Sequence, residues 1–115
     1  MREFEPPPFA IDVAEQEERT LLNLSGELDL ATVGELEAAL ASRLDAGENI
    51  VVDLRGLAFM DSSGVRALVG AHQSAQDGNG SLVIVRASQG SEVDRVIDVS
   101  GIATALGMVD EPPAG

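Results

Sequence analysis

Two adjacent serines stand where a strand-like run gives way to a helix-like run. They belong to the segment Asp61-Ser62-Ser63-Gly64, which follows the branched apolar run Ile50–Leu54. A hydroxyl at a helix start is exposed to solvent, and backbone N–H groups without helical partners lie beside it. Such a place suits the acceptance and release of a phosphate. The pattern therefore predicts a switch at the serines, and it leaves a simple helix cap open as the alternative.

The position of the single histidine argues against hydrolytic chemistry at these serines. A serine nucleophile needs a base within hydrogen-bond reach. His72 lies ten residues after Ser62, and on one helix that separation is ~15 Å at ~1.5 Å per residue. The segment also lacks the Gly-x-Ser-x-Gly turn of serine hydrolases. We therefore expect no enzyme, and we interpret His72 as a helix-edge or core residue.

Metal and nucleotide sites are poorly supported by the remaining polar residues. Glu27, Asp29, Asp53 and Asp61 are candidates to gather at one end of a sheet, where carboxylates bind Mg²⁺ or Ca²⁺. Scattered carboxylates are nevertheless expected in a chain with 20 acidic residues, and no loop has the spacing of a calcium hand. The chain has no lysine, so it has no phosphate-binding Gly-Lys loop. We predict no metal and no cofactor.

The amino-acid composition and net charge of the chain indicate what class of partner it binds. The chain has 115 residues, a net charge of −13 and 3% aromatic residues. This length fits one domain. An acidic chain repels nucleic acid and anionic membranes, so we expect a protein partner with a basic face. The sequence has no cysteine, no signal pattern and no apolar run of about 18 residues. These absences predict a cytoplasmic protein.

Hydrophobic periodicity predicts the elements of the first half of the chain. Apolar residues alternate from Phe9 to Val13, and the run 20–26 forms a second strand after a short polar turn, which indicates a hairpin. Thr32 is predicted to cap a helix, with Glu35 completing a capping box and Gly47 ending the helix. Its apolar face is Val33, Leu36, Leu40 and Leu44.

The second half of the chain alternates strands and helices. Ile50–Leu54 reads as a central strand that is covered on both faces. A helix beginning at Ser62 or Ser63 ends at the turn 77–80, strand 82–85 follows, and Ser91 caps a helix that ends at Ser100-Gly101. A short edge strand over residues 105–109 is a further expectation. The expected inner face of the helix after Ser62 is Val65, Leu68, Val69 and His72.

The order ββαβαβα predicts an α/β fold, a mixed and mainly parallel sheet with helices packed on it. Residues 9–110 form the expected domain, between a proline-rich arm (1–8) and a flexible tail (111–115). The loops 26–32 and 61–64 both leave the carboxyl ends of strands. In open α/β sheets partners and ligands bind at that edge, so we expect the two loops to lie side by side.

Four segments together resemble the anti-sigma factor antagonists of the STAS family. They are Gly26-Glu27-Leu28-Asp29, the strand Ile50–Leu54, the block Phe59–Val65, and Ser100-Gly101-Ile102. The resemblance implies a STAS-like single domain with no catalytic activity of its own. In this family a bacterial sigma factor is controlled, often in stress responses, by partner switching. The antagonist binds an anti-sigma factor that is also an ATP-dependent serine kinase, and it is released once it is phosphorylated.

The same resemblance assigns roles to individual residues. It implies that Ser62 is the phosphorylation site and that a serine phosphatase resets it. It implies a partner-binding site made of Asp29, Met60, Asp61, Ser62, Ser63 and Gly64, on a monomer or weak dimer. The Asp29→Ala variant is accordingly expected to weaken partner binding with little change in melting temperature.

Two other functions stay open from the sequence. One is a STAS subunit of a lipid-transport or stress-signalling complex in which Ser62 only caps a helix. The other is a small-ligand or nucleotide-binding domain. Transfer of phosphate onto Ser62 separates the first from the switch, and a ligand pocket at the sheet edge would favour the second.

Overall fold

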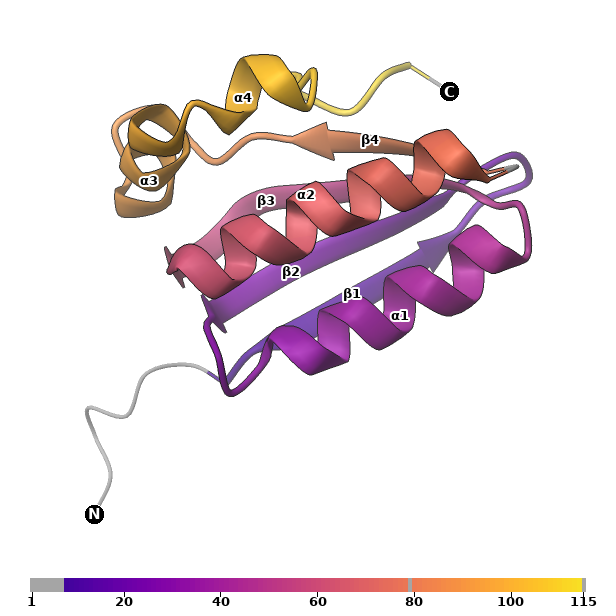
Figure 1. Ribbon diagram of the computed structural model, residues 1–115, viewed down its shortest axis with the longest axis horizontal. Helices are drawn as coiled ribbons and strands as arrows, with labels where there is room; N and C mark the ends of the chain where they lie inside the picture. The colour runs from indigo at the N-terminus through magenta and orange to yellow at the C-terminus, as the bar shows by residue number, and fades with distance from the viewer. Residues whose placement is uncertain (1–7, 79, 115) are drawn as a thin grey trace.

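A four-stranded mixed sheet is built from the segments in which apolar residues alternate or run together (Figure 1). The structure, a computed structural model, describes residues 8–78 and 80–114. The strand order is β1-β2-β3-β4, with β1 antiparallel to β2 and the other pairs parallel, as predicted. The elements are β1 (Ala10–Glu15), β2 (Thr20–Leu28), α1 (Val33–Asp45), β3 (Asn49–Met60), α2 (Ser62–Asp77), β4 (Ser81–Val85), α3 (Glu92–Ser100) and α4 (Ile102–Ala105).

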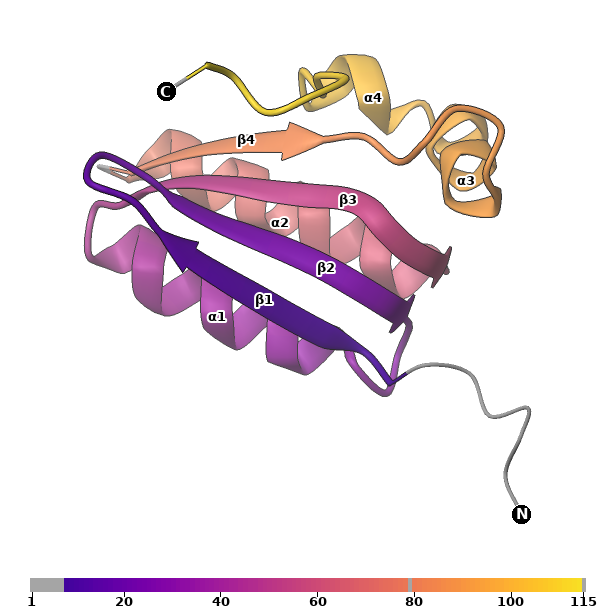
Figure 2. The same cartoon turned by 180° about the vertical axis from the view of Figure 1, so that it is seen from behind.

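Helices α1 and α2 lie side by side on one face of the sheet, and the view from behind shows β1, β2 and β3 with no helix in front of them (Figures 1 and 2). Both helices belong to right-handed crossovers between parallel strands that advance in the same direction, which places them on the same side. Residues Ile50–Leu54 are nevertheless all buried, as predicted for a central strand. The core between the layers is aliphatic and includes Leu22, Leu36, Val52, Leu68 and Ile84.

Strand β3 is much longer than the apolar run that predicts it. It continues to Met60, and its last residues pair with β2, where Phe59 lies opposite Glu27 and Met60 opposite Leu28. The predicted strand, Ile50–Leu54, is therefore too short, because pairing with β2 extends β3 to Met60. Strand β4 pairs with β3 only as far as Asp53, and α3 packs against β3.

Helix α2 buries small residues toward the sheet. Leu68 is buried as predicted, but the other buried residues of α2 are Gly64, Ala67 and Ala71. The expected inner residues Val65, Val69 and His72 are only half-buried. The predicted face is rotated from the observed one because small side chains allow α2 to approach the sheet and α1 closely. Helix α1 buries Leu36, Leu40 and Leu44, as predicted.

The helix ends agree in part with the predicted caps. Gly47 has a φ of +77° after the end of α1, and Gly101 has a φ of +73° after α3, as expected of C-terminal glycines. Ser91 accepts a hydrogen bond from the N–H of Asp94, which confirms that cap. Thr32 occupies the N-cap position of α1, but its side chain makes no capping bond, so the predicted capping box with Glu35 is wrong.

The segment after Gly101 is helical rather than extended. Residues Ile102–Ala105 form α4, and Ile102 and Leu106 are buried in the core. The predicted edge strand 105–109 is reduced to one parallel bridge between Val85 and Val109. Residues 102–105 are helical and so cannot pair with β4, and the described residues after Gly101 meet β4 only at Val109.

Most of the predicted C-terminal tail is described by the structure, whereas most of the predicted N-terminal arm is not. Residues 1–7 of the predicted arm lie outside the described residues. In the predicted tail, the carbonyl oxygen of Pro113 accepts a 2.6 Å hydrogen bond from Nη1 of Arg19. In the described ranges 8–78 and 80–114, no helix is long and apolar enough to cross a membrane.

Candidate functional site

The two acidic loops meet at the carboxyl ends of β2 and β3, as predicted. These strands are parallel neighbours, and their last paired residues are Leu28 and Met60. Immediately after that pair, the N–H of Asp61 donates to the carbonyl oxygen of Leu28 at 3.2 Å. The chain then enters α2 at Ser62, while the β2 side continues into the loop at Asp29. The hydrogen bond holds the Asp29 loop beside the start of α2.

Asp61 is the residue that caps α2. Its Oδ1 accepts hydrogen bonds from the N–H of Ser63 at 2.8 Å and of Gly64 at 3.4 Å. The sequence pattern predicts free N–H groups here that could bind a phosphate, and this prediction is wrong for two of them. The Asp61 carboxylate already occupies two of them, because an aspartate directly before a helix is among the best caps.

Ser62 is the first residue of α2, and it is exposed, whereas Ser63 is half-buried. Within the described ranges, the hydrogen bonds at this turn run to Asp61 and not to the Ser62 hydroxyl. That hydroxyl is therefore presented to solvent on a turn that the strand end and the cap hold in place. Such a group can accept a phosphoryl group from an enzyme that approaches from outside.

Met60 and Gly64 lie beneath this turn rather than on its surface. Met60 is 1% exposed and Gly64 is buried. A Cβ atom on Gly64 would lie 2.6 Å from Cγ of Met60 and 3.0 Å from Cδ2 of Leu28. The first turn of α2 can rest on the two strand ends only because residue 64 has no side chain. These two members of the predicted site therefore support the turn from below.

The Asp29 loop is closed by its own side chains. Oδ1 of Asp29 accepts from the N–H groups of Ala31 at 3.0 Å and Thr32 at 3.2 Å. The Thr32 hydroxyl donates to the carbonyl oxygen of Glu27 at 2.8 Å. At the tip, the side chain of Leu30 is 76% exposed. The loop thus presents a half-buried carboxylate and an apolar residue beside the serine turn.

An apolar groove of about 470 Å³ begins at Ser62 and runs between α2, the end of β3 and α3. Phe59 and Val99 are exposed in it, at 38% and 84%. The sequence patterns do not predict this groove. One available signal is that α3 carries Val99 in addition to the Val93, Val96 and Ile97 needed for its buried face. The groove is lined by Phe59, Met60, Ser62, Val65, Glu92, Arg95, Val96, Val99 and Ser100.

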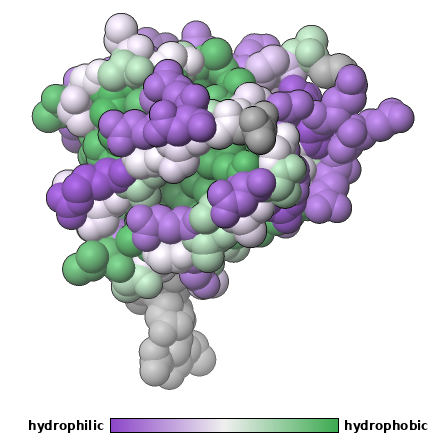
Figure 3. Space-filling model, turned by 45° about the vertical axis from the view of Figure 1, so that its right-hand side comes forward, coloured by the Kyte–Doolittle hydropathy of each residue, from purple (hydrophilic) through white to green (hydrophobic). Residues whose placement is uncertain are grey.

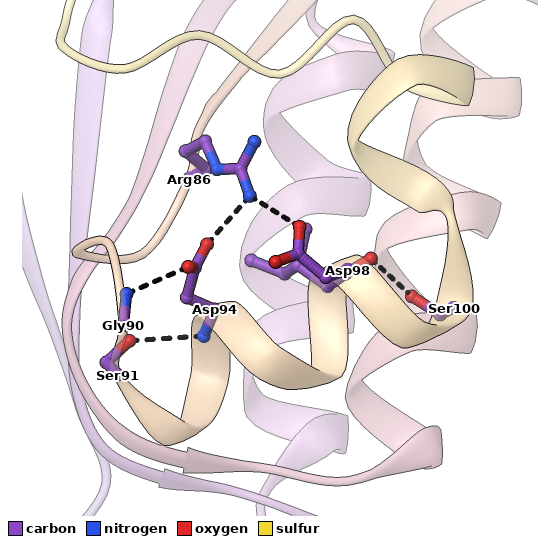
Figure 4. A network of polar contacts seen from close by, with 7 residues as sticks. Arg86, Gly90, Ser91, Asp94, Asp98 and Ser100 are labelled. Carbon is purple, nitrogen blue, oxygen red and sulfur yellow. Dashed lines mark hydrogen bonds and ion pairs between the residues drawn. The ribbon is translucent and has the colours of Figure 1, made fainter.

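A polar network fixes α3 as the wall of this groove (Figure 4). Nη2 of Arg86, just after β4, donates to Asp94 at 2.7 Å and to Asp98 at 2.9 Å. The N–H of Gly90 donates to the second oxygen of Asp94 at 3.0 Å. The Gly90 hydrogen bond, together with the Arg86 guanidinium, holds the pKa of the Asp94 carboxyl below its usual range. The charged form of Asp94 therefore stabilises the docked position of α3.

A second groove, about 440 Å³ in volume, lies between α1 and α2. Hydrophobic surface forms its floor between hydrophilic side chains of the two helices (Figure 3). Leu40, Leu44, Ala67 and Ala71 lie in the floor, and Glu37 and Asp45 lie at the rim. It contains none of the residues predicted from the sequence to form a site.

Asp53 does not join the carboxylates at the sheet edge. Oδ2 of Asp53 pairs with Nη2 of Arg55 at 2.7 Å, in the middle of the sheet opposite Asn23 and Val85. Burial alone would raise the pKa of Asp53, but the hydrogen bonds and the charge of Arg55 outweigh burial and lower it. In the described part of the chain, no group of three or more acidic or histidine side chains is placed to hold a metal ion.

Residues 11–110 match the family model described as Mlab, STAS domain. An anti-sigma-B factor antagonist of Staphylococcus aureus (strain NCTC 8325 / PS 47) is 30% identical over 93 residues, 80% of this chain and 84% of the relative. A crystal structure of an anti-sigma factor antagonist from Mycobacterium paratuberculosis has a TM-score of 0.78 at 21% identity and covers 90% of this chain and 87% of that one. The Bacillus cell fate determinant SpoIIAA in its phosphorylated form has a TM-score of 0.67 at 25% identity and covers 90% and 92%.

Proposed function

This chain belongs to the STAS domain family, and we propose that it is an anti-sigma factor antagonist switched by phosphorylation of Ser62. Unphosphorylated, it binds an anti-sigma factor that is also a serine kinase, and so frees a sigma factor. The observation that carries the proposal is the exposed Ser62 hydroxyl, held between the Asp61 cap and the apolar groove. The chain acts as a cytoplasmic regulator with no catalytic activity of its own.

The chemical step belongs to the partner. The Ser62 oxygen forms a bond to the γ-phosphorus of ATP held by the kinase. The bond from that phosphorus to the oxygen bridging to the β-phosphate breaks, and ADP leaves. A base of the kinase takes the hydroxyl proton. Positioning and charge stabilisation dominate such transfers, so this chain needs only to present the hydroxyl.

Phosphorylation ends binding through charge and hydration. A phosphoserine adds about −1.5 to −2 charges at neutral pH. It would stand next to the Asp61 carboxylate and near the Asp29 loop, and it would have to lose water on entering an interface. A cost of ~3 kcal/mol weakens binding more than a hundredfold. A serine phosphatase restores the binding form.

The residues of the site divide into two layers under this proposal. Asp29, Asp61, Ser62 and Ser63 meet the partner, whose contact face is basic because it faces these acids in a chain of net charge −13. Met60 and Gly64 act beneath them by holding the turn. The exposed Phe59 and Leu30 flank the surface and supply apolar contact area.

The relatives support this proposal. The S. aureus relative is named for antagonism of the anti-sigma-B factor, and SpoIIAA has been solved in a phosphorylated form. The family model that matches is described as a STAS domain, which also fits a second candidate, a STAS subunit of a transport or stress-signalling complex in which Ser62 is not phosphorylated. Phosphate on Ser62 decides between the two.

To test this proposal, the purified chain is used to capture partners from the native cytosol. ATP is then added, and the phosphorylated residues of the chain are identified by mass spectrometry. We expect capture of an ATP-dependent kinase, a single phosphate on Ser62, and release of the complex. Ser62→Ala should be captured without release, while Ser88→Ala, an exposed serine outside the groove, should behave like the unmodified chain. Stable capture of a partner with no phosphate would support the transport subunit instead.

A further inference from the structure

Two arginines have no acidic partner among the described residues, and one lies on the same helix as Ser62 while the other lines the same groove. Six of the seven arginines lie in the described ranges. Three of these pair with carboxylates, and Arg19 binds Gln16 and Pro113. For Arg66 and Arg95, no ion pair within 4 Å exists among the described residues. The paired arginines are Arg43, Arg55 and Arg86.

Both arginines belong to elements that border Ser62. Arg95 lines the same groove as Ser62, from the opposite wall on α3. Arg66 lies four residues after Ser62 on α2, where side chains are neighbours on the helix surface. Both residues are exposed. Two guanidinium groups without an acidic partner among residues 8–78 and 80–114 are unexpected in a chain that has nearly three acids for every base.

The cap directs a phosphate on Ser62 toward these arginines. The N–H groups of Ser63 and Gly64 already donate to Asp61, so they are not free to bind it. The Asp61 carboxylate also repels a second anion. The open side of Ser62 is the groove, where Arg95 provides a planar pair of donors suited to phosphate oxygens.

We propose that Arg95 binds the phosphate of phosphorylated Ser62 across the groove, with Arg66 as a second donor. This inference rests on the proposed phosphorylation of Ser62. The contact ties α3 to the start of α2 and bridges the groove beside Phe59 in the phosphorylated form. The switch then alters this flank of the partner surface as well as adding charge to it.

The experiment introduces phosphoserine at position 62 during translation, so no kinase is needed, and follows the phosphate by ³¹P NMR as pH changes. The second pKa of a phosphoserine is about 6. A guanidinium ~4–5 Å away lowers it by about 0.5 unit or more, even with the weak interaction of an aqueous medium. We expect the pKa of the phosphate to rise by that amount in Arg95→Gln, and to rise less in Arg66→Gln and in Arg95→Lys.

Arg19→Gln removes the same charge at the far end of the sheet and should leave the phosphate unchanged. Equal titration of the parent, Arg95→Gln and Arg19→Gln phosphoproteins would overturn the inference, as would a shift caused by Arg66→Gln alone. Failure of the proposed function is distinguishable from both. In that case the ³¹P shift would be present, but no cellular kinase would modify Ser62 in the capture experiment.

Discussion

The N–H of Asp61 donates to the carbonyl oxygen of Leu28 at 3.2 Å, and this hydrogen bond joins the two loops of the candidate site. Leu28 ends β2 and Asp61 follows the end of β3, so the contact continues the sheet by one bond beyond its last paired residues. The serine turn and the Asp29 loop therefore share one support. A change in either loop is expected to act on the same partner surface.

Replacing Ser62 with aspartate tests the charge component of the switch. Ser62→Asp adds a negative charge to an exposed position, so the fold should be retained while affinity for the partner falls roughly tenfold or more. Binding is measured by calorimetry and folding by circular dichroism. Ser88→Asp adds the same charge outside the groove and should bind normally. Unchanged affinity of Ser62→Asp would contradict the switch.

Replacing Ser62 with alanine tests the release step. Ser62→Ala removes the phosphate acceptor and leaves the apolar groove intact, so the complex should form with parent affinity and persist in ATP. Dissociation rates with and without ATP measure this. Rapid ATP-dependent release of Ser62→Ala would move the switch to another residue, and Ser63→Ala is the next variant to compare.

The Asp29 carboxylate contributes a negative charge to the proposed partner surface and also accepts hydrogen bonds that close its loop. Two variants separate these two contributions. Asp29→Ala loses the acceptor for the N–H groups of Ala31 and Thr32, so, contrary to the expectation from the sequence, it should also lose about 0.5–1.5 kcal/mol of stability. Asp29→Asn keeps an oxygen acceptor and loses only the charge. We expect Asp29→Asn to weaken partner binding with little change in melting temperature. Parent-like binding by Asp29→Asn would leave Asp29 as a structural cap alone.

Gly64 and Gly70 offer a matched pair on α2. A Cβ on Gly64 would meet Met60 at 2.6 Å, whereas a Cβ on Gly70 would have nothing within 4 Å. Gly64→Ala should lose about 1–3 kcal/mol from overpacking. Gly70→Ala should gain about 0.5–1 kcal/mol from helix propensity. Urea unfolding measures the free energy of unfolding of both variants. Equal effects of the two substitutions would contradict close packing of Gly64 against Met60 beneath the serine turn.

Acid should loosen α3 through Asp94. The pKa of Asp94 in the folded state lies below its ordinary value of 3.8, so the unfolded chain takes up the proton first as pH falls. The stability that Asp94 contributes is complete above the ordinary pKa and is lost as pH falls through the folded pKa. The parent melting temperature should fall more steeply than that of Asp94→Asn below about pH 4.

The matched control for this pH dependence is Asp98→Asn, because Asp98 shares Arg86 but is exposed. It should follow the parent curve closely. Thermal unfolding is recorded between about pH 7 and about pH 2.5, the range over which acid titration of carboxyl groups acts on stability. Parallel curves for the parent and Asp94→Asn would show that Asp94 does not hold α3 in place.

Residues close together in the chain carry the signals that predicted most of the fold. The alternation in β1 and β2, the periodic leucines of α1, and the caps at Ser91 and Gly101 depend on contacts within a few residues. The predictions fail where residues that are distant in the sequence make contact in the fold. Pairing with β2 carries β3 to Met60, and close packing turns α2 onto Gly64, Ala67 and Ala71.

The serine turn is a local feature, because an aspartate, two hydroxyls and a glycine between a strand and a helix already specify an exposed Ser62. The groove beside it is not local. Phe59, Arg95 and Val99 come together only when α3 packs against β3 beyond the end of β4, held there by Arg86. Backbone conformation and capping depend on neighbours in the chain and can be inferred from sequence patterns. A surface formed by separate elements depends on the free energy of packing the whole domain, which no short pattern records.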